Sequence, residues 1–226
     1  MKPLEILYED NHLLIVNKPA LLATMGVAED KPSVLSLAKE YVKQKYEKPG
    51  NVYLGVVSRL DAPVTGVLVM ARTSKAASRL SEQFRNRDVD KVYRAVVEGV
   101  PDKPEACLLH WLRKDERHRR VHVTMKDKDT AQEARLRYRL IRELAGDLSL
   151  LEVKLETGRK HQIRVQLSAI GHPIVGDRKY KSNVAFSEGI ALHSYYVKLT
   201  HPVKREPIEI TVSEPPSWRG LLRDVS

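Results

Sequence analysis

The sequence VVSRLDAPVTGVL, residues 56–68, places an arginine and an aspartate in the middle of an apolar stretch. Arg59 and Asp61 are separated by a single leucine, and Pro63 and Gly66 follow them. A charged group close to a core costs free energy unless it has a partner. The ordinary interpretation is a strand that ends in a turn, with Asp61 and Pro63 as turn formers. The alternative is that the two charges belong to a functional site.

The composition bounds the class of protein. The chain has 226 residues, of which 42% are hydrophobic and 30% are charged, as is typical of a soluble globular protein. It contains no apolar run near the roughly 20 residues that a membrane-spanning helix needs. Acidic residues occupy the place where a secretory signal would have its apolar segment. Cys107 is the single cysteine, so the chain cannot form an internal disulfide, and we expect a cytoplasmic protein.

The net charge points to the kind of partner. Lysine and arginine number 39 against 29 acidic residues, which gives a formal net charge of +10. Such an excess favours a polyanion, most often a nucleic acid. Aromatic residues make up only 6% of the chain, so a broad platform for stacking successive bases is not supported. The composition therefore predicts RNA or DNA as the ligand and does not indicate a chemistry.

Hydrophobic periodicity predicts an α+β fold with a mixed, largely antiparallel sheet and a few flanking helices, formed as one domain over residues 1–226. Strands are expected at residues 6–8, 13–16, 55–61, 66–71, 91–99, 134–140, 148–156, 192–199 and 208–212. Helices are expected at residues 33–46, 73–87 and 161–171, with Ser33 capping the first and Gly171 closing the last. Residues 101–130 are expected to be irregular, with a basic loop or hairpin tip at 113–120.

Several familiar catalytic motifs are absent from the sequence. It has no GxSxG motif, no GxxxxGK[ST] loop, no HExxH and no CxxC pair, so neither a P-loop nor a zinc site is predicted. The stretch TGRKHQIRVQLSAIGHPIVGDRKY, residues 157–180, is more informative. Polar and charged residues gather at the start of its expected helix, where Arg164 follows His161 within one turn.

Physical reasoning connects these segments. Burial would neutralise a carboxylate such as Asp61 unless a guanidinium stood against it, and Arg164 is the natural candidate. Tyr93, in the expected strand KVYRAVVEG, has packing in the core as its ordinary interpretation. Near an ionised Asp61, its ring would offer a flat face to a planar ligand. A basic protein with one reactive carboxylate and one stacking ring suggests chemistry on a nucleobase.

Three segments of the chain resemble the RluA-type pseudouridine synthases: residues 6–22, 58–99 and 155–180, in the order found in that family. The resemblance implies the pseudouridine synthase fold with a central cleft, and an enzyme that isomerises uridine to pseudouridine in transfer or ribosomal RNA. It implies no cofactor and no metal. Many family members carry a preceding S4-type RNA-binding domain, and this sequence leaves no room for one before residue 61. A monomer is the default expectation.

The resemblance also assigns roles to individual residues. Asp61 matches the essential aspartate, Tyr93 the tyrosine that stacks on the target base, and Arg164 the basic partner of the aspartate. Arg59 matches the arginine that occupies the space vacated by the flipped nucleotide, and Ile163 matches an apolar position beside Arg164. The aspartate would attack either C1′ of the ribose or C6 of the base, and both routes stay open.

We further expect RNA contacts from the polar start of the third helix, at Thr157, Gly158, Arg159 and His161, and from Arg117 in the basic loop. The sequence departs from the family at Ser58, where a histidine is usual. Two alternatives remain: a catalytically silent RNA-binding protein or assembly factor on the same fold, and a hydrolase that uses Asp61 with His161. The second lacks any signature of an oxyanion-stabilising site.

Overall fold

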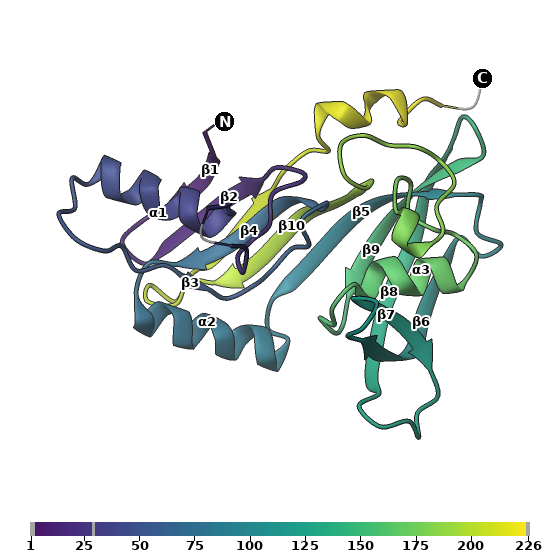
Figure 1. The fold of residues 1–226 in the computed structure, drawn as a ribbon, viewed down its shortest axis with the longest axis horizontal. Helices are drawn as coiled ribbons and strands as arrows, with labels where there is room; N and C mark the ends of the chain where they lie inside the picture. The colour runs from purple at the N-terminus through teal and green to yellow at the C-terminus, as the bar shows by residue number, and fades with distance from the viewer. Residues whose placement is uncertain (1–2, 29, 225–226) are drawn as a thin grey trace. The chain divides into compact units, whose positions relative to one another are not determined.

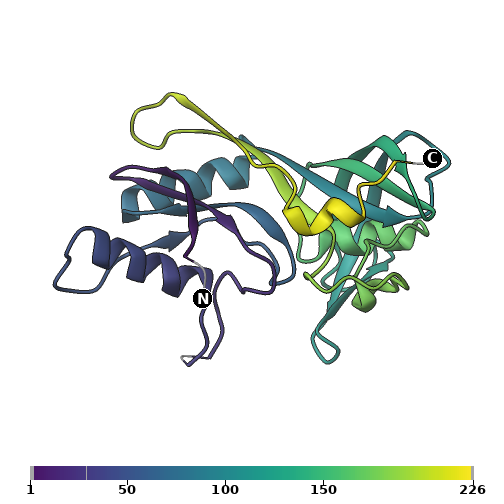
Figure 2. The same cartoon turned by 90° about the horizontal axis from the view of Figure 1, so that it is seen from above.

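The computed structural model describes residues 3–28 and 30–224 of the chain (Figures 1 and 2). These residues form two compact units. The first contains the described residues up to Asp90 together with Ser194–Ser213, and the second contains Lys91–His193 and the described residues from Glu214 onward. The expectation of a single catalytic domain over residues 1–226 stays a prediction.

The first unit is a sheet with two helices. Its strands are β1 (Glu5–Glu9), β2 (Leu13–Lys18), β3 (Gly55–Val56), β4 (Thr65–Ala71), β10 (Leu192–Thr200) and β11 (Pro207–Thr211), and its helices are α1 (Val34–Lys45) and α2 (Ser74–Asn86). The spatial order is β1-β2-β4-β10, with β11 paired to β10 and β3 paired to β4. The β1–β2, β2–β4, β3–β4 and β10–β11 pairs are all antiparallel.

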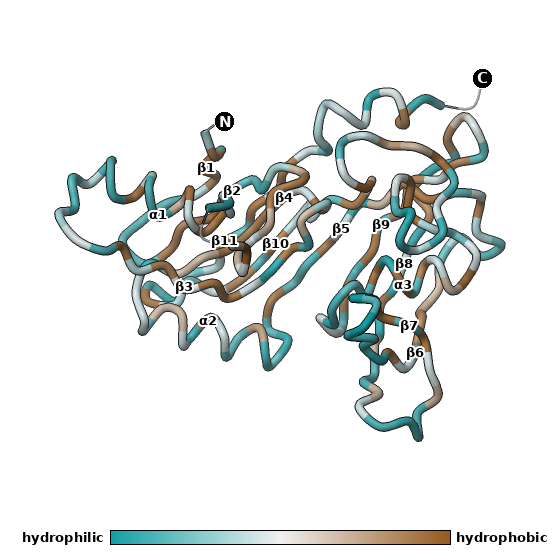
Figure 3. Tube along the Cα trace, in the orientation of Figure 1, coloured by the Kyte–Doolittle hydropathy of each residue, from teal (hydrophilic) through white to brown (hydrophobic). Residues whose placement is uncertain are grey.

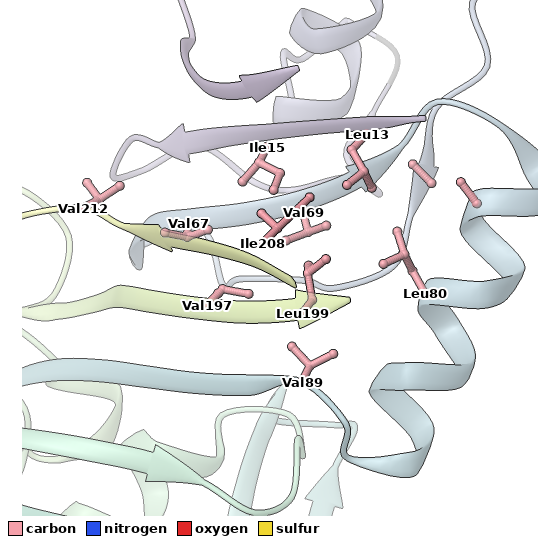
Figure 4. Packing of buried hydrophobic residues seen from close by; sticks show 12 residues of the cluster. Leu13, Ile15, Val67, Val69, Leu80, Val89, Val197, Leu199, Ile208 and Val212 are labelled. Atoms are coloured by element: carbon pink, nitrogen blue, oxygen red, sulfur yellow. The ribbon is translucent and has the colours of Figure 1, made fainter. Parts of the chain in front are cut away.

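Alternation along the strands builds the core of this unit. Leu13 and Ile15 on β2 and Val67 and Val69 on β4 share one face, and they pack with Leu80 of α2 (Figure 4). All seven residues of β4 are buried, because α1 lies on the opposite side of the sheet from α2 (Figures 1 and 2). The continuous apolar run of β4 in the sequence thus reflects a strand that is covered on both faces.

Both helices of the first unit begin at the residues that the sequence predicts. The Ser33 side chain accepts a hydrogen bond from the backbone N–H of Ser36, and the Ser36 side chain accepts one from the N–H of Ser33, which completes a capping box. Thr73 caps α2 through the N–H of Ala76, and Arg87 ends this helix in the left-handed conformation. The expected helices at residues 33–46 and 73–87 are confirmed.

The second unit is an antiparallel sheet with one helix on its face. Its strands are β5 (Asp90–Glu98), β6 (Glu105–Asp115), β7 (Arg120–Thr124), β8 (Gln132–Leu144) and β9 (Leu148–Leu155), in the order β5-β9-β8-β6-β7. Helix α3 (Gln162–Ala169) packs against β6 and β7. Two 3₁₀ turns are also present, η1 (Arg178–Tyr180) and η2 (Pro216–Gly220). The prediction of an α+β fold with a largely antiparallel sheet is confirmed.

The hydropathy of the chain follows this arrangement, with apolar residues concentrated on the strands and polar residues in the connections (Figure 3). On β8, Ala134, Leu136 and Tyr138 are buried, whereas Arg137 and Arg139, which alternate with them, are exposed. The strand expected at residues 134–140 is therefore confirmed, with buried and exposed side chains alternating along it. Since β8 pairs with both β6 and β9, it is a central strand with one polar face.

Two expectations need correction. The stretch 55–61 is a strand only over Gly55–Val56, and the residues from Val57 to Asp61 form no ladder. Residues 101–130 are not irregular, because they contain β6 and β7, although the predicted hairpin tip is confirmed between these strands at residues 116–119. In the part of the chain that the structure describes, no helix is long and apolar enough to cross a membrane.

Candidate active site

Asp61 stands at the first position of a tight turn in the first unit. The N–H of Val64 donates to the carbonyl oxygen of Asp61 at 3.0 Å, which closes a turn over Ala62 and Pro63. The predicted role of Asp61 and Pro63 as turn formers is confirmed. The side chain of Asp61 is half-buried, whereas that of Arg59, on the preceding segment, is exposed.

A threonine from a distant part of the chain fixes the residue before Asp61. The Thr24 hydroxyl donates to the carbonyl oxygen of Leu60 at 2.7 Å and accepts from the N–H of Leu60 at 3.2 Å. Both backbone groups of Leu60 are therefore satisfied by one buried side chain. This contact explains why residues 57–61 hold a defined course without belonging to a strand ladder.

Lys18, the last residue of β2, supports the turn from the other side. Its side chain is fully buried, and its Nζ donates to the carbonyl oxygens of Pro19 at 2.8 Å and of Ala62 at 3.0 Å. Burial lowers the pKa of Lys18 to about 7, and the negative charge of Asp61 opposes this shift. A buried cation is thus tied to the residue that follows Asp61, and it interacts electrostatically with the carboxylate.

Gly66 allows β4 to begin where it does. It has a φ of +107°, and a Cβ added there would lie 2.3 Å from the carbonyl oxygen of Ser194. Only glycine permits so close an approach of two backbones at this φ. Gly66 is paired with Lys18 across the β2–β4 ladder, so the close contact also sets the position of the buried lysine.

In the second unit, Tyr93 lies on β5 opposite Val153 of β9, and its side chain is buried with 8% of its surface exposed. This agrees with the ordinary interpretation of a tyrosine that packs its ring among the strands. Its predicted role in stacking on a base stays a prediction.

The segment that leads into α3 is fastened to β8. The Thr157 hydroxyl accepts from the N–H of Arg135 at 2.9 Å and donates to Gln162 Oε1 at 2.7 Å. Gln162 in turn accepts from the N–H of Arg159 at 2.9 Å and donates to the carbonyl oxygen of Arg135 at 3.0 Å. Thr157 is buried, while Gly158 and Arg159 are exposed. Thr157 is therefore a structural anchor, and its exposed neighbours are the residues that a ligand can reach.

Arg164 forms a two-pronged ion pair inside the second unit. Its Nε lies 2.6 Å from Asp177 Oδ2 and its Nη2 lies 2.9 Å from Asp177 Oδ1, and the two side chains are 7% and 1% exposed. The guanidinium also lies over the ring of Tyr180, with Cζ 5.1 Å from the ring centroid. The arginine side chain is thus held in one orientation by a carboxylate and an aromatic ring.

The remaining predicted residues of the second unit differ in their surroundings. His161 has a φ of +54°, and its Nδ1 lies 2.7 Å from the Tyr180 hydroxyl, which accepts from the N–H of Val121. Ile163 is buried on α3, in agreement with its predicted apolar role. Arg117 is exposed at the tip of the β6–β7 hairpin. His161 therefore has a structural contact, and Arg117 is placed on an accessible surface.

A family model described as RNA pseudouridylate synthase matches residues 12–169. The chain belongs to this family. The matched segment contains the Asp61 turn, β5 with Tyr93, and helix α3 with Arg164.

Individual members of the family cover nearly the whole chain. The ribosomal large subunit pseudouridine synthase D of Xylella fastidiosa is 35% identical over 237 residues, which cover 97% of this chain and 69% of that protein. The tRNA pseudouridine synthase C of Vibrio cholerae is 31% identical over 239 residues, which cover 98% of this chain and 95% of that protein. The solved structure of human RNA pseudouridylate synthase domain containing 4 superposes with a TM-score of 0.76 and 25% identity, covering 95% of this chain and 91% of that one.

Membership confirms the predicted resemblance and class of enzyme: the chain is an RNA pseudouridine synthase, which isomerises uridine in RNA. The structure groups the predicted site residues within its units. Arg59 and Asp61 lie in the first unit, and Tyr93, Arg117 and the predicted residues from Thr157 to Arg164 lie in the second. The pairing of Asp61 with Arg164 would join these groups, and it stays a prediction.

Two residues of the site escaped the sequence argument, Lys18 and Asp177. Lys18 stands in the segment NKP, at the end of an expected strand. Its signal is a lysine two positions after Val16, in a strand whose preceding residues Leu13–Val16 are all buried. Asp177 follows Arg164 by 13 residues in a segment bounded by glycines. Its spacing carries no helical or strand period, so no sequence pattern links it to the arginine.

Proposed function

We propose that this pseudouridine synthase uses Asp61 as its nucleophile on a uridine that is flipped out of a structured RNA. The proposal rests on the residues that surround Asp61. In a chain of this family, the aspartate stands on a turn that Thr24 and a buried Lys18 hold in place. A carboxylate that served only as a turn former would not need a buried cation beside it.

The proposed reaction needs no external reagent. The N1–C1′ bond of the uridine breaks, a C5–C1′ bond forms, the hydrogen on C5 leaves, and N1 gains a proton, so that the product is an isomer of the substrate. Asp61 attacks C1′ of the ribose or C6 of the base in the first step and is released in the last. In either route its carboxylate must be ionised at the start.

Arg164 can serve as the partner of Asp61 without giving up Asp177. A guanidinium has five N–H donors, and the contacts with Asp177 occupy the one on Nε and one on Nη2. A guanidinium with five donors can bind two carboxylates at once. In this proposal Asp177 fixes the orientation of the arginine, and Arg164 together with Lys18 keeps Asp61 negatively charged in a site from which the substrate excludes water.

The other predicted residues complete the proposal. A uridine within a stacked RNA must be extruded, at a cost of a few kcal/mol. Tyr93 would stack on the extruded base, and Arg59, which is exposed, would fill the space left in the RNA. Contacts of Arg117 and Arg159 with the RNA backbone would offset the cost of extrusion.

The relatives suggest which RNA is the substrate. The name of the Xylella protein gives the large ribosomal subunit as its target, and the name of the Vibrio protein gives transfer RNA. We propose a uridine in one of these two classes. Incubation of the protein with total RNA from a strain that lacks it, followed by mapping of pseudouridines, would identify the site by the positions that are gained.

The Asp61→Asn variant tests the nucleophile. We expect it to lower single-turnover pseudouridine formation by at least about a thousandfold, because an amide cannot replace the attacking carboxylate. Its affinity for the RNA should change little, since the variant keeps the shape of the side chain and the basic surfaces.

The matched control is Asp147→Asn, which replaces an exposed aspartate of the second unit and should retain full turnover. Substantial turnover by the Asp61→Asn variant would refute the proposed nucleophile. Tight RNA binding by the wild-type protein without any modified position would instead favour the silent RNA-binding alternative, and RNA cleavage would favour a hydrolase.

A further inference from the structure

A cavity of about 320 Å³ lies within the second unit, beside the β6–β7 hairpin and the segment that leads into α3. We propose that this cavity, which we name the hairpin pocket, binds an unpaired nucleotide of the RNA other than the target uridine. The inference rests on the proposed function and adds to it a second place where the enzyme holds its substrate. The hairpin pocket is distinct from the Asp61 turn, which belongs to the first unit.

The charges of the hairpin pocket suit a phosphate. Lys114, Arg159 and Lys160 line it, with Glu116 as the acidic lining residue, so its lining carries a net charge of about +2 at neutral pH. All four side chains belong to exposed residues, so the charges stand where a polyanion can reach them. The hairpin tip adjoining Glu116 adds Arg117 and other cations to the same region.

The apolar residues that line the hairpin pocket suit a base. Leu112 and Val121 line it, and both are buried members of a small core that they form with Ala134, Val165 and Tyr180. Because Leu112 and Val121 pack in this core, the apolar part of the lining is held in place. Thr130 and Gln132 line it as well, and they supply hydroxyl and amide groups that can pair with the edge of a base. The apolar residues and the neutral polar groups suit the base of one nucleotide, and the exposed cations suit its phosphate.

Arg159 is prepared for this role by its backbone and its Nε. The N–H of Arg159 donates to Gln162 Oε1, and its Nε donates to the carbonyl oxygen of Glu133 at 3.0 Å. These contacts hold the side chain across the end of β8. Its two terminal nitrogens carry four further N–H groups, which is the arrangement that suits phosphate oxygens.

The size of the cavity favours a single unpaired nucleotide over double-stranded RNA. Pockets for small ligands have volumes of about 300–1,000 Å³, so the hairpin pocket is near the lower limit and admits one nucleotide rather than a duplex. Sequence-specific recognition of RNA commonly uses unstacked bases of loops and bulges. The hairpin pocket would therefore select RNAs that present an unpaired nucleotide in addition to the target uridine.

The test combines crosslinking with the salt dependence of binding. The probe is cellular RNA that carries 4-thiouridine, taken from a strain that lacks this enzyme. It is bound to the Asp61→Asn protein, so that no turnover is required. Irradiation should crosslink the RNA to peptides that contain Thr130–Gln132 or Lys160, because a base in the hairpin pocket would contact them.

The Lys114→Gln/Lys160→Gln double variant, made in the same Asp61→Asn protein, removes two of the three cations. We expect it to weaken RNA binding by on the order of tenfold and to reduce the slope of log affinity against log salt by about 1.4, which is about 0.7 for each phosphate contact with single-stranded RNA. Lys103→Gln, which removes one exposed cation elsewhere in the second unit, is the matched control and should change the slope by far less.

The absence of crosslinks to these hairpin-pocket peptides would overturn the inference, and so would a double variant that binds RNA as the control does. An acidic polypeptide as the true occupant would give the latter result. Failure of the proposed function is recognised separately, because the wild-type protein would then form no pseudouridine in any RNA, whatever the crosslinks show.

Discussion

Lys18 is the most unusual single residue of the first unit, because a lysine is rarely buried without a reason. Its Nζ replaces bulk water with two carbonyl oxygens, of Pro19 and Ala62, and with the nearby charge of Asp61. Burial nevertheless lowers its pKa from an ordinary value of 10.5 to about 7. Near neutral pH the lysine is therefore poised between its charged and neutral forms, beside the proposed nucleophile.

This depressed pKa makes the stability of the protein depend on pH. Between pH 7 and about 10 the unfolded chain keeps a proton on Lys18 that the folded protein has lost. Raising the pH through this window therefore favours the folded state, by up to about 1.4 kcal/mol per pH unit. Below pH 7 both states are protonated, and the contribution of Lys18 is constant.

The variant Lys18→Met isolates this effect. We expect the free energy of unfolding of the wild-type protein, relative to Lys18→Met, to rise with pH between 7 and 10 and to be level below pH 7. Urea denaturation at a series of pH values measures the difference. Lys39→Met, on the exposed surface of α1, is the control and should show no such trend. A level difference over the whole range would mean that the pKa of Lys18 is not depressed.

Asp61 and Arg164 show how much the sequence can predict about single residues. Asp61 and Arg164 stand out because a charge interrupts an apolar pattern, and burial then demands a partner for each. The sequence does not predict which residue contacts each of them. Lys18 and Asp177 reach their positions through the pairing of β2 with β4 and through a loop after α3, and neither contact leaves a period in the sequence.

Strand β4 illustrates how a motif can be fixed by backbone geometry rather than by chemistry. The pair Thr65-Gly66 begins β4, shortly after the Asp61 turn. In the structure, Gly66 lets β4 approach Ser194 with a φ of +107°. Gly66 therefore aligns the start of β4 with Lys18 of β2, next to the Asp61 turn.

We expect Gly66→Ala to lower the free energy of unfolding by more than about 2 kcal/mol, because it adds both an unfavourable φ and a Cβ 2.3 Å from a carbonyl oxygen. Chemical denaturation measures the loss. Gly50→Ala, where a Cβ would meet no heavy atom within 4 Å, should change stability by no more than about 0.5 kcal/mol. Equal losses in the two variants would show that the close contact with Ser194 is not required.

Strands and helices with one apolar face were predicted correctly from the sequence. The prediction failed where a side-chain contact satisfies the backbone in place of strand pairing. Strand β8 and helices α1 and α2 have regular periods and were located correctly. The stretch before Asp61 was expected to be a strand, but the side chain of Thr24 satisfies the backbone of Leu60 instead. Strand β6 was missed because exposed Leu109 breaks the alternation of its apolar residues.

The net charge of +10 does not act uniformly, because the arginines differ in their neighbours. The arginines of β8, at residues 135, 137 and 139, are largely balanced by glutamates. Arg137 lies 2.8 Å from Glu156, and Arg139 lies 3.1 Å from Glu152. The β6–β7 hairpin, by contrast, presents exposed arginines at residues 117, 119 and 120. The hairpin is therefore expected to supply more of the attraction for RNA than the row on β8.

Two triple variants with the same change of charge separate these groups. Replacing the hairpin arginines, Arg117, Arg119 and Arg120, by glutamine should reduce the slope of log RNA affinity against log salt by about 2, since each lost phosphate contact contributes about 0.7 for single-stranded RNA. The same replacement of Arg135, Arg137 and Arg139 should reduce it by less than 1, because these side chains already neutralise glutamates. Filter binding over a range of salt concentrations measures both slopes. Equal reductions would show that total charge, and not the local pairing of each arginine, governs the capture of RNA.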